Sequence, residues 1–318
     1  MGLMPCKMAE VPNSPILESP PLVPLTGEEC YIDLVKDILD NGEVRDGRNG
    51  KTLSVFSRRL EFNVREKGFP LLTTKRVFFR GVVEELLWFL RGSTDTRELK
   101  AKGIHIWDAN STREFLDAAG LHDIATGFIG AGYGHQIRNF CGHYGETHKT
   151  GADQLYHILH ELTHNPHGRR AVLSMWNPKQ LTRAALPPCH MLYQFYIGKN
   201  GISCQMTQRS ADVAAGLPFN IASTTLLTTI IGHILGLPVD RIIIDIGDAH
   251  IYEQHIENMK LQMARPLRSF PELVINKDPP QAICRTDDKI EWIESLEFSD
   301  FEVVGYDPHP PLRYELIA

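Results

Sequence analysis

The stretch that decides the fold runs from residue 186 to residue 220 and reads LPPCHMLYQFYIGKNGISCQMTQRSADVAAGLPFN. Two strand-like runs, 191–197 and 202–208, follow one another and predict a hairpin, and a long helix is expected from Phe219. Pairing of the two strands brings Arg209 near Cys189. Because a neighbouring cation turns a thiol into a good nucleophile, this stretch predicts covalent catalysis by Cys189.

The flanking sequence continues the mixture of helices and strands. Helical spacing of apolar residues predicts helices over 28–39, 82–90, 153–164 and 252–264, and Ser93 or Thr94 is expected to cap a further helix. Strands are expected over 52–64, with a bulge at 57–59, and over 171–176 and 241–246. Since strands succeed one another directly as well as across helices, we expect an α+β (mixed α/β) layer rather than a doubly wound fold.

The N-terminal residues differ in composition from the rest of the chain. Six prolines lie between Pro5 and Pro24, without the basic and apolar segments of a signal peptide. We therefore expect residues 1–27 to be a flexible tail and 28–318 to form a single domain, since no linker interrupts it. The most apolar run, 221–237, contains Ser, Thr and His233, so no membrane anchor is expected.

Charge and cysteine content narrow the class of protein. Thirty-three Lys and Arg against 39 Asp and Glu give a formal charge of -6, the wrong sign for binding a long nucleic acid. The six cysteines form no CxxC pair, which favours a reducing, cytoplasmic compartment over a disulfide framework or a thiolate zinc site.

The segment His160-Glu161-Leu162-Thr163-His164 matches the HExxH pattern of zinc peptidases. At 100° per residue, however, the histidines lie opposite the apolar stripe formed by residues 155, 158, 159 and 162. The pattern therefore predicts a solvated helix face and no metal site.

Two other patterns have an ordinary structural interpretation. The glycines at 127, 130, 132 and 134 do not follow the spacing of a dinucleotide loop, so we expect a loop that needs positive φ angles. The pairs Arg58-Arg59 and Lys75-Arg76 are short, which favours solvated side chains or a single-phosphate contact.

Taken together, several motifs closely resemble the thymidylate synthase family. They are PPCH at 187–190, QRSxD at 208–212, GLPFN at 216–220, the pair Arg169-Arg170, GDAHIY at 247–252 and YDPHP at 306–310. The resemblance extends from about Glu29 to the C-terminus. It implies a homodimer whose large bulged sheet, packed by helices, forms the interface. It also implies conversion of dUMP to dTMP with 5,10-methylenetetrahydrofolate as carbon donor and reductant, releasing dihydrofolate, without metal or NAD(P).

The resemblance also implies a role for individual residues. Cys189 adds to C6 of the uracil, Asn220 matches N3-H and O4, and Glu85 organises proton transfer near Tyr133. The implied catalytic set is Cys189, Glu85, Tyr133, Asn220, Asp212 and Arg209.

The same comparison assigns two ligand sites. The dUMP site comprises Arg48, Arg169, Arg170, His190, Gln208, Arg209, Ser210, Asp212, Asn220, His250 and Tyr252, with Arg169 and Arg170 given by the partner subunit. The folate site comprises Ile106, Trp107, Asn110, Asp212, Gly216, Phe219, Ile317 and Ala318, the last two closing over the ligand.

Several positions depart from the family pattern. The phosphate loop is one residue shorter, which leaves Arg45 as a competitor of Arg48 for the phosphate. The loop 127–134 and its following residue Ile137 differ, as do Ala215, Thr207 and Thr225. We therefore expect altered folate contacts and missing interface or pocket hydroxyls.

Two other functions fit parts of the pattern. A sister pyrimidine hydroxymethyltransferase uses the same thiol and folate, although Asn220 disfavours its cytosine form. A non-catalytic paralog that binds nucleotide or RNA fits the altered loop, but retention of Cys189, Glu85 and Asp212 disfavours it.

Overall fold

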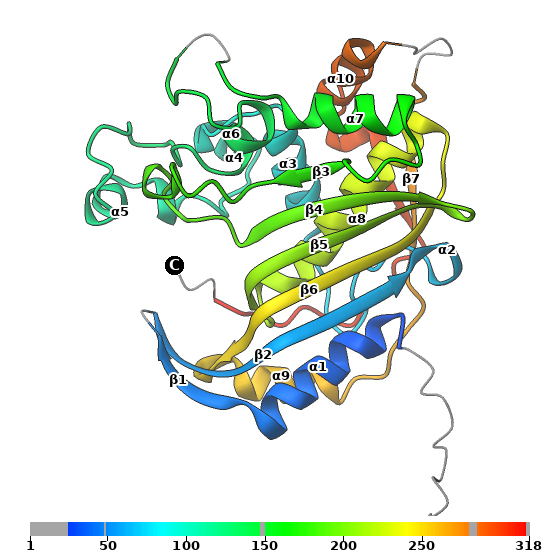
Figure 1. Ribbon diagram of the computed structural model, residues 1–318. Coiled ribbons are helices and arrows are strands. Elements are labelled where there is room, and N and C mark those ends of the chain that lie inside the picture. The colour runs from blue at the N-terminus through cyan, green and yellow to red at the C-terminus, as the bar shows by residue number, and fades with distance from the viewer. Residues whose placement is uncertain (1–24, 48, 147–149, 280–284, 316–318) are drawn as a thin grey trace, which may run out of the picture.

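A computed structural model describes residues 25–47, 49–146, 150–279 and 285–315 (Figure 1). Its centre is a six-stranded sheet in the order β1-β2-β6-β5-β4-β3. Strands β5 and β6 are parallel and joined by helix α8, and the other neighbours are antiparallel. The predicted mixed α+β sheet is confirmed. The strands are β1 (Glu43–Gly47), β2 (Gly50–Asn63), β3 (Val172–Ser174), β4 (His190–Gly198), β5 (Gly201–Asp212) and β6 (Val239–Tyr252).

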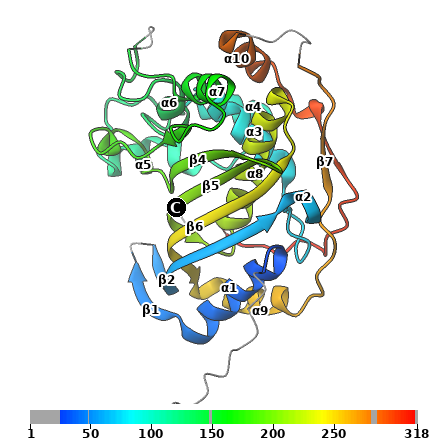
Figure 2. The same ribbon diagram turned by 45° about the vertical axis from the view of Figure 1, so that its right-hand side comes forward.

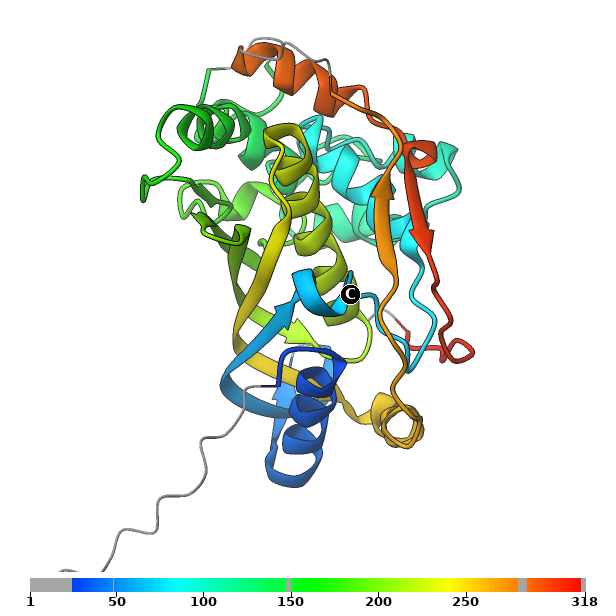
Figure 3. The same cartoon turned by 90° about the vertical axis from the view of Figure 1, so that its right-hand side faces the viewer.

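Helices α1 and α8 cover one face of this sheet, and the ribbon formed by β7 and β8 lies on the far side of α8 (Figure 3). Helix α9 runs beside α1 (Figure 2). The helices are α1 (Glu28–Asn41), α2 (Val64–Lys67), α3 (Phe79–Leu90), α4 (Thr96–Ala101), α5 (Arg113–Ala118), α6 (Tyr133–Arg138), α7 (Gln154–His164), α8 (Gly216–Leu235), α9 (Ile256–Met263) and α10 (Thr286–Glu294); the ribbon is β7 (Glu272–Ile275) with β8 (Phe301–Val304).

Helix α8 starts at Gly216, three residues before the predicted position, and forms the centre of the core. It is the one helix in the described part of the chain that is long and apolar enough to cross a membrane, and 78% of that apolar window is buried inside the fold. Burial between the sheet and α3 accounts for its apolar composition.

The predicted break in strand β2 is confirmed. Val55 points into the core, and the inward positions then shift to Leu60 and Phe62. Between them Ser57 has a φ of 62°, opposite Gly247 of β6. A Cβ atom on Gly247 would lie 2.6 Å from the carbonyl oxygen of Arg209, so only glycine allows β5 to approach here. The sheet is therefore distorted next to the strand that carries Arg209.

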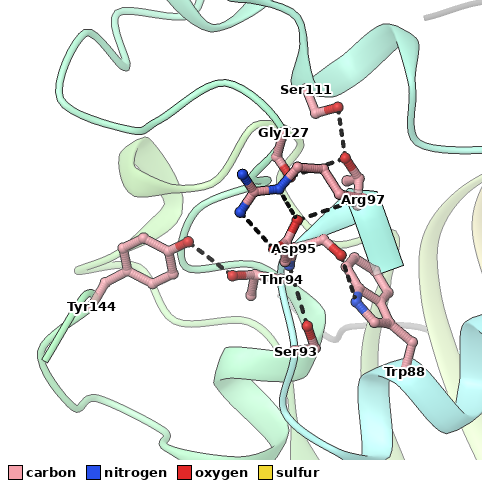
Figure 4. A network of polar contacts seen from close by, with 9 residues as sticks. Trp88, Ser93, Thr94, Asp95, Arg97, Ser111, Gly127 and Tyr144 are labelled. Atoms are coloured by element: carbon pink, nitrogen blue, oxygen red, sulfur yellow. Dashed lines mark hydrogen bonds and ion pairs between the residues drawn. The ribbon is translucent and has the colours of Figure 1, made fainter. Parts of the chain in front are cut away.

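The cap of α4 differs from the prediction. Asp95, not Ser93 or Thr94, caps this helix, because its carboxylate accepts from the Arg97 backbone N-H (Figure 4). The Trp88 indole donates to the Asp95 carbonyl oxygen over 3.1 Å, which fixes this residue in place. Three consecutive polar residues compete for the cap, and the contact with α3 selects the third.

The glycine-rich loop is anchored to the same network (Figure 4). The Thr96 hydroxyl donates to the Gly127 carbonyl oxygen over 2.9 Å. Gly127 and Gly130 have positive φ angles of 90° and 69°, as the sequence predicts, whereas Gly132 and Gly134 do not. The loop leads directly into α6, which begins with Tyr133.

The last described residues pack along the segment 72–77. The Tyr306 hydroxyl donates to the Leu72 carbonyl oxygen over 2.8 Å, and the His309 backbone N-H donates to the Thr73 carbonyl oxygen over 2.7 Å. These contacts hold residues 306–314 against the loop that carries Lys75.

Candidate active site

A cavity of about 450 Å³ lies among α3, α6, the start of α8 and the ends of β4 and β5. It brings together most of the residues that the sequence singled out, from segments more than one hundred residues apart. These are Glu85, Ile106, Trp107, Asn110, Tyr133, Cys189, His190, Gln208, Ser210, Asp212, Gly216, Phe219 and Asn220.

The predicted proximity of Cys189 and Arg209 is confirmed. The Arg209 backbone N-H donates to the Cys189 carbonyl oxygen over 3.0 Å, and guanidinium Nη2 lies 3.7 Å from Cys189 Sγ. The carbonyl oxygens of Pro187 and Pro188 accept from the guanidinium over 2.8 and 2.9 Å. The two prolines thus hold a positive charge beside the sulfur, where it favours nucleophilic chemistry.

Other thiols in the described chain lack this setting. Cys30 and Cys204 are buried, which raises the pKa of each thiol to about 12. Cys141 is exposed on a loop and receives only the Asn177 amide. Cys189 is therefore the thiol with both a cation and access to the cavity.

Glu85 and Tyr133 line the same cavity as Cys189. The Trp107 indole donates to Glu85 Oε1 over 2.8 Å, and the Cys189 backbone N-H donates to the Tyr133 hydroxyl over 2.9 Å. The Tyr133 ring stacks on Phe89, with centroids 4.8 Å apart, so that its hydroxyl is held in place. Burial raises the pKa of Glu85 from its ordinary 4.5 to about 7, and the Trp107 hydrogen bond opposes this rise.

This raised pKa makes a prediction about stability. The folded protein keeps Glu85 protonated between pH 4.5 and 7, whereas the unfolded chain releases the proton, so the stability of the wild type falls as the pH rises through this window. Relative to Glu85→Gln, the wild type should lose up to about 3 kcal/mol between pH 4.5 and 8. Urea unfolding of both proteins at equal concentration measures this difference. A difference that stays constant with pH would contradict the assignment.

Two amides form a directional pair at the floor of the cavity. Gln208 Nε2 donates to the Ser210 carbonyl oxygen over 2.9 Å and to Asn220 Oδ1 over 2.8 Å. A carbonyl oxygen only accepts, so the Gln208 atom facing it is the nitrogen, and the Asn220 atom facing that nitrogen is the oxygen. Asn220 Nδ2 is therefore left as a donor.

Lys75 is a cavity residue that the sequence interpretation missed. The sequence favoured a solvated side chain or a single-phosphate contact, but Lys75 is only 6% exposed, and its ammonium donates to the Ala214 carbonyl oxygen over 2.5 Å. Burial lowers the pKa of Lys75 to about 8, an effect that the charge of Asp212 opposes. The ammonium also lies 4.3 Å from the centre of the Tyr314 ring. The sequence around this lysine, which an arginine follows, contains no pattern that predicts a buried side chain.

Asp212 stands between this lysine and the start of α8. Its Oδ1 accepts from the backbone N-H groups of Ala214 and Ala215 over 2.9 and 3.2 Å. Arg76 also lines the cavity, and the rest of the wall that the sequence did not single out comprises Val77, Phe78, Phe89, Leu186, Pro218, Leu312 and Tyr314.

Some predicted residues lie outside the cavity. Arg169 and Arg170 are exposed in the turn after α7. His250 and Tyr252 lie at the end of β6, where His250 Nδ1 is 3.0 Å from Asp248 Oδ1. Arg45 pairs with Glu43 and Asp248. Arg48, Ile317 and Ala318 lie outside the described residues.

The prediction that the histidines of α7 lie on a solvated face is confirmed. His157, His160 and His164 are exposed, whereas the apolar stripe, residues 155, 158, 159 and 162, is buried. The rings of His160 and His164 stack with centroids 4.2 Å apart. Among the residues that the structure describes, no group of three or more His, Cys, Asp or Glu side chains is placed to hold a metal ion.

Comparison with known proteins agrees with this geometry. Residues 29–318 match the model of the family described as thymidylate synthase. The chain is 43% identical over 326 residues to the thymidylate synthase of Homo sapiens, covering 98% of this chain and 99% of that protein. It is 46% identical over 297 residues to the thymidylate synthase of Varicella-zoster virus (strain Dumas), covering 92% of this chain and 95% of that protein.

A longer relative matches over part of its length. The chain is 46% identical over 294 residues to the bifunctional dihydrofolate reductase-thymidylate synthase 2 of Arabidopsis thaliana, covering 91% of this chain and 50% of that protein. The chain thus spans about half the length of this relative. The match over residues 29–318 and the near-complete coverage of the human protein establish that this chain belongs to the thymidylate synthase family.

Proposed function

We propose that this chain catalyses the reductive methylation of dUMP to dTMP, with 5,10-methylenetetrahydrofolate as carbon donor and reductant and dihydrofolate as by-product. The observation that carries the proposal is the thiol of Cys189, held 3.7 Å from the Arg209 guanidinium in a cavity whose floor presents the Asn220 amide. The thiol supplies a nucleophile, and the amide supplies a donor for a uracil carbonyl.

In the first step Cys189 Sγ adds to C6 of uracil. The S–C6 bond forms while the C5–C6 π pair moves toward C5 and O4, which makes C5 nucleophilic. Asn220 Nδ2 donates to O4 and stabilises the charge that develops there. Once a carbon is attached at C5, the proton on C5 must leave. Glu85, whose pKa of about 7 suits both uptake and release of a proton, organises that transfer near Tyr133.

The remainder of the cavity suits a flat, partly polar ligand such as a folate. Ile106, Trp107 and Phe219 provide an apolar wall. Beside them Asn110 is 6% exposed, and its Nδ2 has no hydrogen-bond partner, so it is available to a ligand acceptor. Asp212 and Gly216 border the same space. When bound, the folate supplies the one-carbon unit and the hydride that reduces it.

We propose a homodimer in which Arg169 and Arg170 complete the phosphate site of the partner, beside Arg209, Ser210 and Arg48. His250 and Tyr252 would hold the 3'-hydroxyl of the ribose. The exposure of both arginines, away from their own cavity, supports this assignment. The open face of the sheet also exposes the apolar rings of Phe56 (71%) and Tyr196 (66%), as expected of a surface that a second copy covers. Residues 28–318 would be the catalytic domain of a cytoplasmic enzyme.

If each active site contains residues of both subunits, two inactive variants should complement each other. Cys189→Ala and Arg170→Ala should each be almost inactive, and mixing them should restore activity, because one site of each heterodimer receives an intact thiol and an intact arginine. Random exchange of equal amounts gives roughly one quarter of the sites intact. Steady-state dTMP formation after exchange measures the recovery. Absence of recovery, with heterodimers demonstrated by tagged subunits, would contradict shared sites.

The proposed reaction itself is tested with dUMP carrying tritium at C5. Wild-type protein with methylenetetrahydrofolate should release tritium to water in step with dTMP, which chromatography separates. A hydroxymethylated nucleotide in place of dTMP would assign the chain to the sister activity. Nucleotide binding without tritium release would support the non-catalytic alternative.

A further inference from the structure

His190 and Tyr193 form a hydrogen-bonded pair that the sequence gives no reason to expect. Residues three apart on a regular strand point to opposite faces. In β4 a register shift between His190 and Leu192 places both side chains on the same side. His190 Nδ1 then lies 2.7 Å from the Tyr193 hydroxyl oxygen. His190 lines the cavity, whereas Tyr193 is 3% exposed and stands behind it.

The direction of this hydrogen bond follows from the two groups. Burial lowers the pKa of His190 to about 4, so the ring is neutral and has one donor and one acceptor nitrogen. Burial raises the pKa of Tyr193 well above its ordinary value, so the hydroxyl keeps its proton. The Thr224 hydroxyl is near enough to oppose the rise in the Tyr193 pKa, but by distance and angle it has no hydrogen-bond partner, whereas His190 Nδ1 lies at 2.7 Å. A buried O-H without an acceptor is unfavourable, so Tyr193 donates to Nδ1, and His190 carries its proton on Nε2.

A hydrogen bond with the Asn220 side chain opposes the effect of burial on the pKa of His190. Because Nδ1 is taken by Tyr193, Nε2 is the nitrogen available for this contact. Gln208 Nε2 donates to the oxygen of the same amide over 2.8 Å. With Nε2-H as the donor in that contact, His190 and Gln208 would both donate to Asn220 Oδ1, and both would disfavour a flipped amide. The orientation that remains presents Nδ2 to the base, where it meets the O4 acceptor of uracil and opposes the 4-amino donor of cytosine.

We propose that Tyr193 is a specificity-determining positioning residue that fixes His190 as the Nε2-H tautomer and thereby holds Asn220 in the orientation that selects uracil over cytosine. The proposal rests on the proposed function, and it concerns a buried residue that does not line the cavity.

The substitution Tyr193→Phe tests it, because it removes the hydroxyl and keeps the ring. We expect kcat/KM for dUMP to fall and the ratio of kcat/KM for dCMP to that for dUMP to rise about 5- to 20-fold, as for loss of one buried hydrogen bond. Tritium release from C5 of each nucleotide measures both values. An unchanged ratio, or dCMP turnover still below detection, would overturn the proposal.

The matched control is Tyr144→Phe, which removes another partly buried hydroxyl, bonded to Thr94 over 2.8 Å outside the cavity. It should leave the ratio unchanged, and a shift equal to that of Tyr193→Phe would overturn the proposal. If Tyr193→Phe does not fold, ¹⁵N spectra of histidine-labelled wild type decide, since a proton on Nδ1 of His190 contradicts the inference and one on Nε2 supports it. Failure of the wild type to form dTMP would instead reject the proposed function.

Discussion

Cys189→Ala is expected to lower dTMP formation by about 10⁴-fold or more and to abolish covalent capture of 5-fluoro-dUMP in the presence of the folate. Fluorine at C5 cannot leave as a proton, so the nucleotide stays attached to the thiol that attacked C6. The effect is large because all later steps require C5 to be nucleophilic, and Cys189 is the cavity thiol that lies beside a guanidinium.

Mass spectrometry of the intact protein, denatured after incubation, measures the adduct. Cys141→Gly is the matched control, because Cys141 has an exposed thiol and a φ of 62°, which glycine adopts without strain. This variant should retain both the adduct and turnover. An adduct of full stoichiometry on Cys189→Ala would show that another residue is the nucleophile.

Asn220→Asp is expected to lower kcat/KM for dUMP and to raise the ratio of kcat/KM for dCMP to that for dUMP by on the order of 100-fold. In the wild type Gln208 Nε2 donates to the Asn220 oxygen, and we expect it to donate to one carboxylate oxygen of the variant in the same way. The substitution replaces the N-H donor by an oxygen and adds a negative charge at this position. That oxygen repels O4 of uracil and accepts from the 4-amino group of cytosine, so the two bases are affected in opposite directions.

Competition between dCMP and dUMP in one assay gives the ratio of their kcat/KM values without separate protein standards. Asp212 also lines this cavity, and its carboxylate accepts from the Ala214 backbone N-H just before α8. Asp212→Asn therefore tests whether a change of charge in the cavity is enough to alter the preference between dUMP and dCMP. It should lower activity on both nucleotides together. A ratio that does not change in Asn220→Asp would mean that Asn220 does not distinguish the bases.

The sequence predicts well the features that depend on residues close together in the chain. The solvated face of HELTH follows from a period of 100° per residue over one helix, and α7 has that face. The hairpin of β4 and β5 follows from two adjacent strand-like runs, and it brings Arg209 to Cys189. The bulge in β2 follows from a break in alternation at Ser57.

Boundaries and caps were less predictable, because several local signals compete at the same place. Asp95 replaces Ser93 or Thr94 as the cap of α4, since Trp88 holds its carbonyl oxygen. The choice depends on a contact with a neighbouring helix, and any of the three polar side chains suits a cap by itself.

The sequence by itself therefore predicted the longer helices and the central strands, the proximity of Arg209 to Cys189, and the family. Only the tertiary structure decided that Lys75 is buried, that burial raises the pKa of Glu85 to about 7 against the opposing effect of the Trp107 hydrogen bond, and that Tyr193 reaches His190. The physical reason is that desolvation and hydrogen-bond direction depend on every group packed around a side chain, and these groups come from segments far apart in the chain.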